Sequence, residues 1–319
     1  MDPEIHAADI ARRDSEFYHY DGNIVLSATD KENRTIYFRL HKSILAKQSP
    51  VFADMFTAAS PVDQYDGVPL VVMPGDDADE MRAFIALFYE PQCITTILEE
   101  TYFTLKLLGP ARLANKYQVD WISKMIASKL EKSWPSTLQG WLKFADDEFE
   151  SDFRSYDAMG DPSWGDKTLE LREFPEPVSS ILLARECNAT SILPCAFLEL
   201  LRRHPEADDA ALARPLLSLH DSHRLLLARE RIGRWYADHE WKSTLCQSDK
   251  LCQVTLLRTL MELATQINRD GHALQLWIRG DNYRSDQMCP GCKTEFVKEV
   301  QALQNHFFEQ LSSFFDLNG

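Results

Sequence analysis

The chain has 319 residues, of which 45% are hydrophobic and 26% charged, and it carries a net charge of −15 at pH 7. This composition predicts a globular protein with room for about two domains, and it lacks the clustered Lys and Arg residues that a nucleic-acid surface needs. No apolar run approaches the roughly 20 residues of a membrane helix, and residues 1–14 hold no apolar signal core. We therefore expect neither nucleic acid nor a membrane as a partner, and we expect an intracellular protein, cytoplasmic or nuclear.

A pair of strands is predicted near the N-terminus, after a short segment over residues 1–19. Ile24–Leu26 and Ile36–Phe38 are runs of β-branched, aliphatic and aromatic residues, which favour strands. The polar residues Asp30–Arg34 between them are typical of a hairpin connection. The two runs therefore predict antiparallel strands.

Two short helices are predicted next. Apolar residues recur at helical spacing from Leu40 to Leu45, and a second stripe is formed by Val51, Phe52, Met55 and Phe56. Pro50 separates the two stripes, because proline is favoured at the first position of a helix and disfavours a helical residue before it. We expect a tight helical pair packed against the small sheet.

This region closely resembles the BTB/POZ domain. In that family a strand that ends in an aromatic residue is followed by His, then a Leu-Ala pair, then Ser and Phe, and Lys42 matches the basic position after the His. The matching signature residues of this chain are Phe38, His41, Lys42, Leu45, Ala46, Ser49, Phe52 and Phe56.

The resemblance continues along the chain. Pro69–Met73 corresponds to the family's third strand, and Ala78–Tyr89 corresponds to a helix whose start, at Asp77 and Glu80, has the residue types and spacing of a capping box. Residues 107–130 correspond to the family's closing helices. Four matched segments in order make the resemblance specific. It implies an α+β fold with a BTB/POZ core, a small β-sheet capped by helices, over residues 20–132, followed by a mainly α-helical C-terminal region.

The resemblance implies a protein-interaction module, and two roles are open for it. In the first, the BTB domain recruits a cullin-type ubiquitin ligase scaffold while the helical region holds a substrate. In the second, it is a homo- or hetero-oligomerising component of a transcriptional or signalling complex. The dimer of BTB transcription factors uses an additional N-terminal helix and strand, and residues 1–20 supply only a short segment. The acidic partner that the family places near Lys42 is either Asp21 or is replaced by Asn23.

An acidic segment follows the predicted BTB core. Residues 133–176 are expected to form a helix and then an acidic linker, since residues 146–176 hold eleven acidic and three basic residues, a net charge of −8. Two interpretations are open: a solvated linker, or a docking segment for a basic partner. The second would be anchored by the interleaved aromatic residues Phe149, Phe153, Tyr156 and Trp164.

Residues 177–319 are predicted to form an α-helical domain, because apolar residues recur three and four positions apart. The sequences WPSTLQGWLKF, PVSSILLARECNATSILPCAFLELLRRHP and the final FFDL resemble the C-terminal part of a large group of BTB proteins in mushroom-forming fungi. No kelch-like repeat and no zinc-finger array of the kind often joined to BTB domains is found. Partner identity therefore stays open.

Four of the seven cysteines form the one group of residues in the sequence that is suited to bind a metal ion. Cys289 and Cys292 are separated by two residues, and Cys246 and Cys252 offer a second pair. Four thiolates would complete a tetrahedral structural zinc site. The 36 residues between Cys252 and Cys289 are unlike the spacing of common zinc fingers, so unbridged cysteines on packed helices are the alternative. An odd number of scattered cysteines favours reduced thiols over a disulfide framework.

No catalytic site is predicted. The sequence has no glycine-rich phosphate loop, no Gly-x-Ser-x-Gly and no His-Glu-x-x-His. His220 and His223 are more consistent with a polar helix face than with a metal site, and His41 is expected to have a structural role. Apart from the zinc ion, no cofactor is expected, and the partners are proteins.

Overall fold

The computed structural model describes residues 12–58, 63–100, 102–144, 175–202, 217–239, 246, 250–255, 257–259 and 288–317. The chain divides into two compact units. One comprises Met1–Lys129 with Arg185–Asn188, and the other comprises Leu130–Ala184 with Ala189–Gly319. Of the helices within the described ranges, none is both long and apolar enough to cross a membrane.

The first unit is built on a five-stranded sheet with strand order β1-β3-β2-β5-β4. β2 (Ile24–Thr29) and β3 (Thr35–Leu40) form the predicted antiparallel hairpin. Within the hairpin turn, the Asp30 carboxylate accepts hydrogen bonds from the Arg34 amide at 2.8 Å and from Arg34 Nε at 2.7 Å. β5 (Val68–Asp77) extends the predicted third strand, lies parallel to β2, and pairs at its other side with the two-residue β4 (Gln64–Tyr65).

The strand β1 (Arg12–Tyr18) lies within the segment for which no strand was predicted, and it pairs in parallel with β3. Its sequence is mostly polar, and its two buried side chains are Asp14 and Phe17. The Asp14 carboxylate accepts from Arg82 Nε at 2.7 Å and from the backbone amides of residues 16 and 17. The ion pair of Asp14 and the buried ring of Phe17 therefore hold this edge strand, whose sequence shows no apolar alternation.

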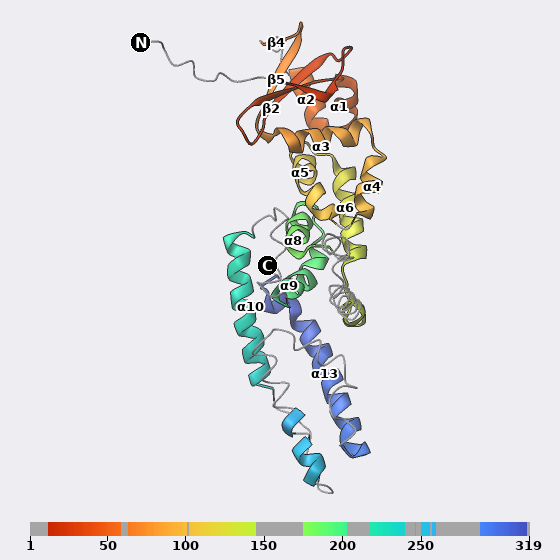
Figure 1. The fold of residues 1–319 in the computed structure, drawn as a ribbon, viewed down its shortest axis with the longest axis vertical. Coiled ribbons are helices and arrows are strands. Elements are labelled where there is room, and N and C mark those ends of the chain that lie inside the picture. Colours follow the sequence, from red (N-terminus) through yellow and green to blue (C-terminus); the bar gives the residue numbers. More distant parts are fainter. Residues whose placement is uncertain are drawn as a thin grey trace, which may run out of the picture. The chain divides into compact units, whose positions relative to one another are not determined.

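Helices cover the sheet (Figure 1). α1 (Lys42–Gln48) and α2 (Pro50–Ala58) are the predicted pair, with Pro50 as the first residue of α2. α3 (Ala78–Tyr89) has the predicted bounds, and the Asp77 carboxylate caps it by accepting from the amides of residues 79 and 80. The carboxylate of Glu80 pairs with Arg112. The remaining helices of this region are α4 (Cys93–Glu99), which was not predicted, α5 (Phe103–Lys116) and α6 (Asp120–Ser133).

Ser49 and Tyr117 join the helices of the first unit. The buried Ser49 hydroxyl donates to the Tyr117 carbonyl oxygen at 2.6 Å and accepts from the Phe52 amide at 3.1 Å. The Tyr117 ring stacks on Phe52, with ring centroids 4.5 Å apart, and on Phe84, at 5.9 Å. Its hydroxyl donates to the buried carboxylate of Asp76. The core thus closes around one aromatic side chain.

The second unit is helical in its described residues, as predicted. Its main helices are α8 (Pro177–Glu186), α9 (Leu193–Arg202), α10 (Leu219–Ala237) and α13 (Pro290–Phe314), with the short η2 (Thr190–Ile192) before α9. Glu176, the last residue of the predicted linker, is buried and accepts from the amides of Val178 and Ser179 at the start of α8. Residues 146–174 of the acidic segment lie outside the described residues.

Replacing Ser49 tests the junction between α1 and α2. Ser49→Ala removes the acceptor of the Phe52 amide and the donor to Tyr117, so the free energy of unfolding should fall by about 1–2 kcal/mol. Urea unfolding followed by tryptophan fluorescence measures the change, and hydrogen exchange at the start of α2 should accelerate. The control is Ser43→Ala at an exposed position of α1, which should stay within about 0.5 kcal/mol. Equal effects in the two variants would contradict this role.

Candidate functional site

The four predicted metal-ligating cysteines come together in the second unit. The Sγ atoms of Cys246, Cys252, Cys289 and Cys292 all lie within 4.8 Å of one another, and those of Cys246 and Cys289 are 3.8 Å apart. All four are free thiols. The buried Cys246 and Cys252 belong to an apolar cluster with Tyr236, Met288, Phe296, Val300 and Leu303, and Cys289 and Cys292 pack against it. Four sulfur donors at this separation could hold a metal ion.

The start of α13 places half of this cluster. Cys289 is the N-cap residue, Pro290 begins the helix, and Cys292 lies in its first turn. The neighbouring Cys289 sulfur raises the pKa of the Cys292 thiol, and burial raises the pKa of Cys252. The Cys289 amide donates to Cys252 Sγ at 3.3 Å, an interaction that favours the thiolate form of the acceptor.

Three cysteines lie outside this cluster. Burial raises the pKa of the Cys187 and Cys195 thiols to about 12 each, so neither carries appreciable thiolate at neutral pH. Burial also raises the pKa of Cys93 in α4. Because the thiolate is the reactive form, we interpret these three cysteines as packed side chains and not as reactive thiols.

The histidines that the sequence singled out have other surroundings. His220 and His223 are exposed on α10, while Asp221 between them is buried and contacts Arg224 Nη1 at 3.3 Å. The exposed His306 lies beside Trp235, with ring centroids 5.4 Å apart. None of the three joins the metal-compatible group found among the described residues.

In the first unit, His41 is held by contacts at both ring nitrogens. Its amide donates to the Tyr89 hydroxyl at 2.9 Å, its Nδ1 lies 3.0 Å from the same oxygen, and its Nε2 lies 3.2 Å from Asp21 Oδ1. The His19 ring stacks on Tyr89, with centroids 4.8 Å apart. Burial raises the pKa of the Tyr89 hydroxyl, which keeps it protonated. This group links the start of α1 to the last residue of α3.

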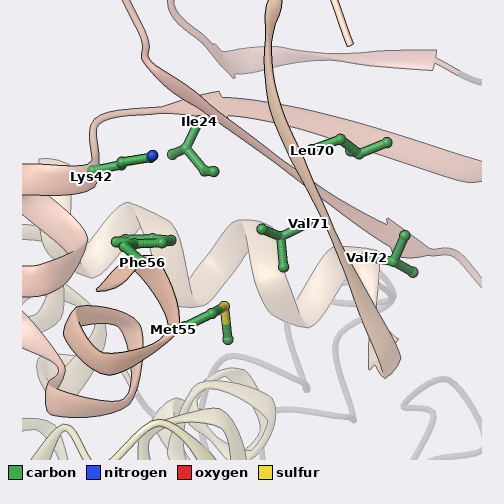
Figure 2. Close-up of a pocket in the computed structure, with 7 residues that line it drawn as sticks. All are labelled: Ile24, Lys42, Met55, Phe56, Leu70, Val71 and Val72. Carbon is green, nitrogen blue, oxygen red and sulfur yellow. The ribbon is translucent and has the colours of Figure 1, made fainter. Parts of the chain in front are cut away.

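The other signature residues divide into a core set and a surface set. Phe38, Leu45, Ser49 and Phe52 are fully buried, whereas Ala46 is half-buried in α1. Lys42 and Phe56 are also half-buried, and both line a hollow of about 240 Å³ (Figure 2). The full lining is Ile24, Lys42, Met55, Phe56, Leu70, Val71 and Val72.

The hollow is apolar with a single cation beside it. Lys42 Nζ lies 5.8 Å from the centroid of the Phe56 ring, and Figure 2 shows this side chain extending over the ring. Asp21 pairs with His41, and the Asn23 side chain accepts from the Lys42 amide at 2.8 Å. Among the described residues, Lys42 Nζ forms no ion pair. Val72 is 63% exposed, so the β5 side of the hollow presents apolar surface to solvent.

A second surface runs along the outside of α3. Met81, Phe84, Ile85 and Phe88 face the core, while Asp79 and Ala83 are exposed on α3 four residues apart, and the exposed Glu90 follows as the C-cap residue. We call these three residues the α3 stripe. Pro91 and Gln92 continue it as exposed residues. The stripe combines small and acidic side chains, and the other face of the helix is buried in the core.

Comparison with known families addresses this first unit directly. Residues 23–133 match the family model of the BTB/POZ domain. This segment is a BTB/POZ domain. It is a general protein–protein interaction module, of a kind that is typically non-catalytic. A search of curated proteins found no match to the chain, and the resemblance of its C-terminal part to a fungal group stays a prediction.

Sequence reasoning missed several contacts of the BTB domain. The pairing of Asp14 with Arg82 and of Asp21 with His41 joins residues far apart in the chain, and no local pattern predicts such pairs. A signal did exist for Val72: an apolar strand such as β5, with no polar residue between Pro69 and Met73, places apolar side chains on both faces of a sheet. Leu70, Val71 and Val72 of this strand all line the hollow.

Replacing Tyr89 tests the group around His41. Tyr89→Phe removes the acceptor of the His41 amide while the ring stays, so the free energy of unfolding should fall by about 1–2 kcal/mol. Urea unfolding of the full chain measures this change. The matched control is Tyr20→Phe at an exposed tyrosine, where a shift within about 0.5 kcal/mol is expected. If Tyr89→Phe is as stable as its control, the hydroxyl contributes nothing to the junction.

Proposed function

We propose that the chain is an adaptor whose BTB domain recruits a cullin-type ubiquitin ligase scaffold and whose C-terminal helical unit holds a substrate. Such an adaptor acts in the cytoplasm or the nucleus. The observation that supports the docking part most is the α3 stripe, Asp79, Ala83 and Glu90, which the BTB domain leaves exposed.

The α3 helix is a rigid platform for a partner. Its start is capped by Asp77, its inner face is buried, and Arg82 fastens it to Asp14 of β1. Its end is held by the contacts of Tyr89 with His41. A surface that is already ordered loses little conformational entropy when it binds. The platform therefore suits a partner that docks on it without rearrangement.

The charge of the α3 stripe indicates which kind of partner surface would bind to it. Asp79 and Glu90 are acidic, and the whole chain carries a net charge of −15. Complementary charge accelerates association and suppresses wrong partners. We therefore expect the contacting surface of the scaffold to be basic, with a small apolar contact near Ala83.

The hollow beside Lys42 favours a second candidate, self-association or association with another BTB domain. Its apolar lining and the exposed Val72 form a surface that is more stable when another chain covers it. In this alternative the chain is an oligomerising component of a transcriptional or signalling complex, without a ligase role.

A pull-down separates the adaptor role from other functions. Ala83→Arg places a long cationic side chain in the centre of the α3 stripe, so binding to the N-terminal domains of cullin scaffolds should fall by at least about tenfold, the loss expected from one disrupted central contact. The control is Ala302→Arg at an exposed position of α13, which should leave binding unchanged. Failure of the wild-type chain to bind any cullin contradicts the adaptor proposal.

Light scattering over a concentration series tests the oligomeric alternative. If the hollow is a contact surface, the average mass should rise with concentration, and Val72→Glu should return the chain to a monomer because it buries a charge in an apolar contact. The exposed Glu16→Gln variant is the control and should associate as the wild type does. A strict monomer at all concentrations argues against this alternative.

A further inference from the structure

We infer that Cys246, Cys252, Cys289 and Cys292 bind one zinc ion that holds together this end of the C-terminal unit. This inference goes beyond the docking function, and it does not depend on which partner the BTB domain binds. It rests on the geometry of the four sulfurs, on their donor chemistry and on the place of two of them at the start of α13.

The distances between the sulfurs fit a tetrahedral site. Zinc–sulfur bonds of about 2.3 Å place the sulfurs of a tetrahedron about 3.8 Å apart. Cys246 Sγ and Cys289 Sγ are 3.8 Å apart, and no pair of the four exceeds 4.8 Å. A shift of at most about 1 Å in the side chains therefore brings all four to bonding distance. Disulfides would require sulfur contacts of about 2.05 Å, and all four cysteines are free.

The donor set selects the metal. Thiolates are soft ligands that favour zinc, copper(I) and iron, and they disfavour the hard ions magnesium and calcium. Four thiolates in a tetrahedral arrangement satisfy zinc completely. Such a site leaves no open position for water or a substrate, so its role is structural and not catalytic.

A bound zinc ion would deprotonate the thiols that coordinate it, and two features of the fold favour the resulting thiolates. Cys289 and Cys292 lie at the N-terminus of α13, where unpaired amides and the helix dipole favour negative charge. The Cys289 amide donates to Cys252 Sγ at 3.3 Å, as amides around ligated sulfurs do. The first observation concerns the two cysteines at the start of α13, and the second extends the same stabilisation to Cys252.

The ion would connect segments that are distant in the sequence. Cys252 and Cys289 are separated by 36 residues, yet they meet beside Met288, Phe296 and Val300. A local core of this size gains stability from a metal cross-link, and metal binding then contributes directly to folding. Loss of zinc should therefore loosen the start of α13 and leave the BTB domain folded.

Elemental analysis of the full-length chain tests the inference. Protein purified with a phosphine reductant and zinc in the medium should contain about one zinc ion per chain. The Cys289→Ser, Cys292→Ser double variant should lose nearly all of it. The control is Cys93→Ser, which changes a half-buried thiol outside the cluster and should keep the zinc.

A second measurement covers the case in which the double variant fails to fold. Cobalt(II) exchanged into the wild-type chain should give the visible absorption of a tetrahedral tetrathiolate centre, and added zinc should abolish that absorption. The inference is overturned if the wild type holds no stoichiometric metal, if it holds iron instead, if the double variant folds and keeps its zinc, or if non-reducing mass spectrometry finds disulfides among these cysteines. Cullin binding is a separate measurement, so failure here is distinct from failure of the adaptor proposal.

Discussion

The contacts of Tyr117 join the elements of the BTB domain. Its carbonyl oxygen accepts from the Ser49 hydroxyl, its ring packs on Phe52 and Phe84, and its own hydroxyl donates to Asp76. Burying these polar groups is favourable only because each has a hydrogen-bond partner. One residue after α5 therefore ties together α2, α3 and the end of β5, and the positions of both candidate docking surfaces follow from it.

The two units use different means to define their interiors. In the BTB domain, aromatic stacking and satisfied buried polar groups fix the helices on a sheet. In the C-terminal unit, aromatic contacts at one end of α13, such as Trp235 with Phe307 and with Phe314, are combined with a cluster of sulfurs at the other. The first unit therefore presents rigid surfaces for partner proteins, whereas a bound metal ion would contribute to the stability of the second.

Local signals predicted the hairpin, the α1–α2 junction and α3, because turn residues, Pro50 and the Asp77 cap act within a few positions of the chain. β1 could not be predicted this way, since its sequence is mostly polar and the partner of its buried Asp14, Arg82, is remote in the chain. The four cysteines were identified from spacing and residue type, but their meeting depends on how the chain folds between Cys252 and Cys289. The sequence left two positions, Asp21 and Asn23, for the partner of Lys42; in the structure Asp21 pairs with His41, and the Asn23 side chain accepts from the backbone amide of Lys42.

The ion pair that fastens β1 also affects the electrostatics of the α3 stripe. Arg82 contacts Asp14 through Nε and Asp79 through Nη1, so these three side chains together carry a single negative charge while β1 is in place. Removing Asp14 from the group would leave Arg82 and Asp79 electrically neutral as a pair. The potential that an approaching protein meets at α3 therefore depends on whether the N-terminal strand is seated on the sheet. In this way β1 would help to set the rate at which a partner protein associates with α3, although β1 itself does not contact that partner.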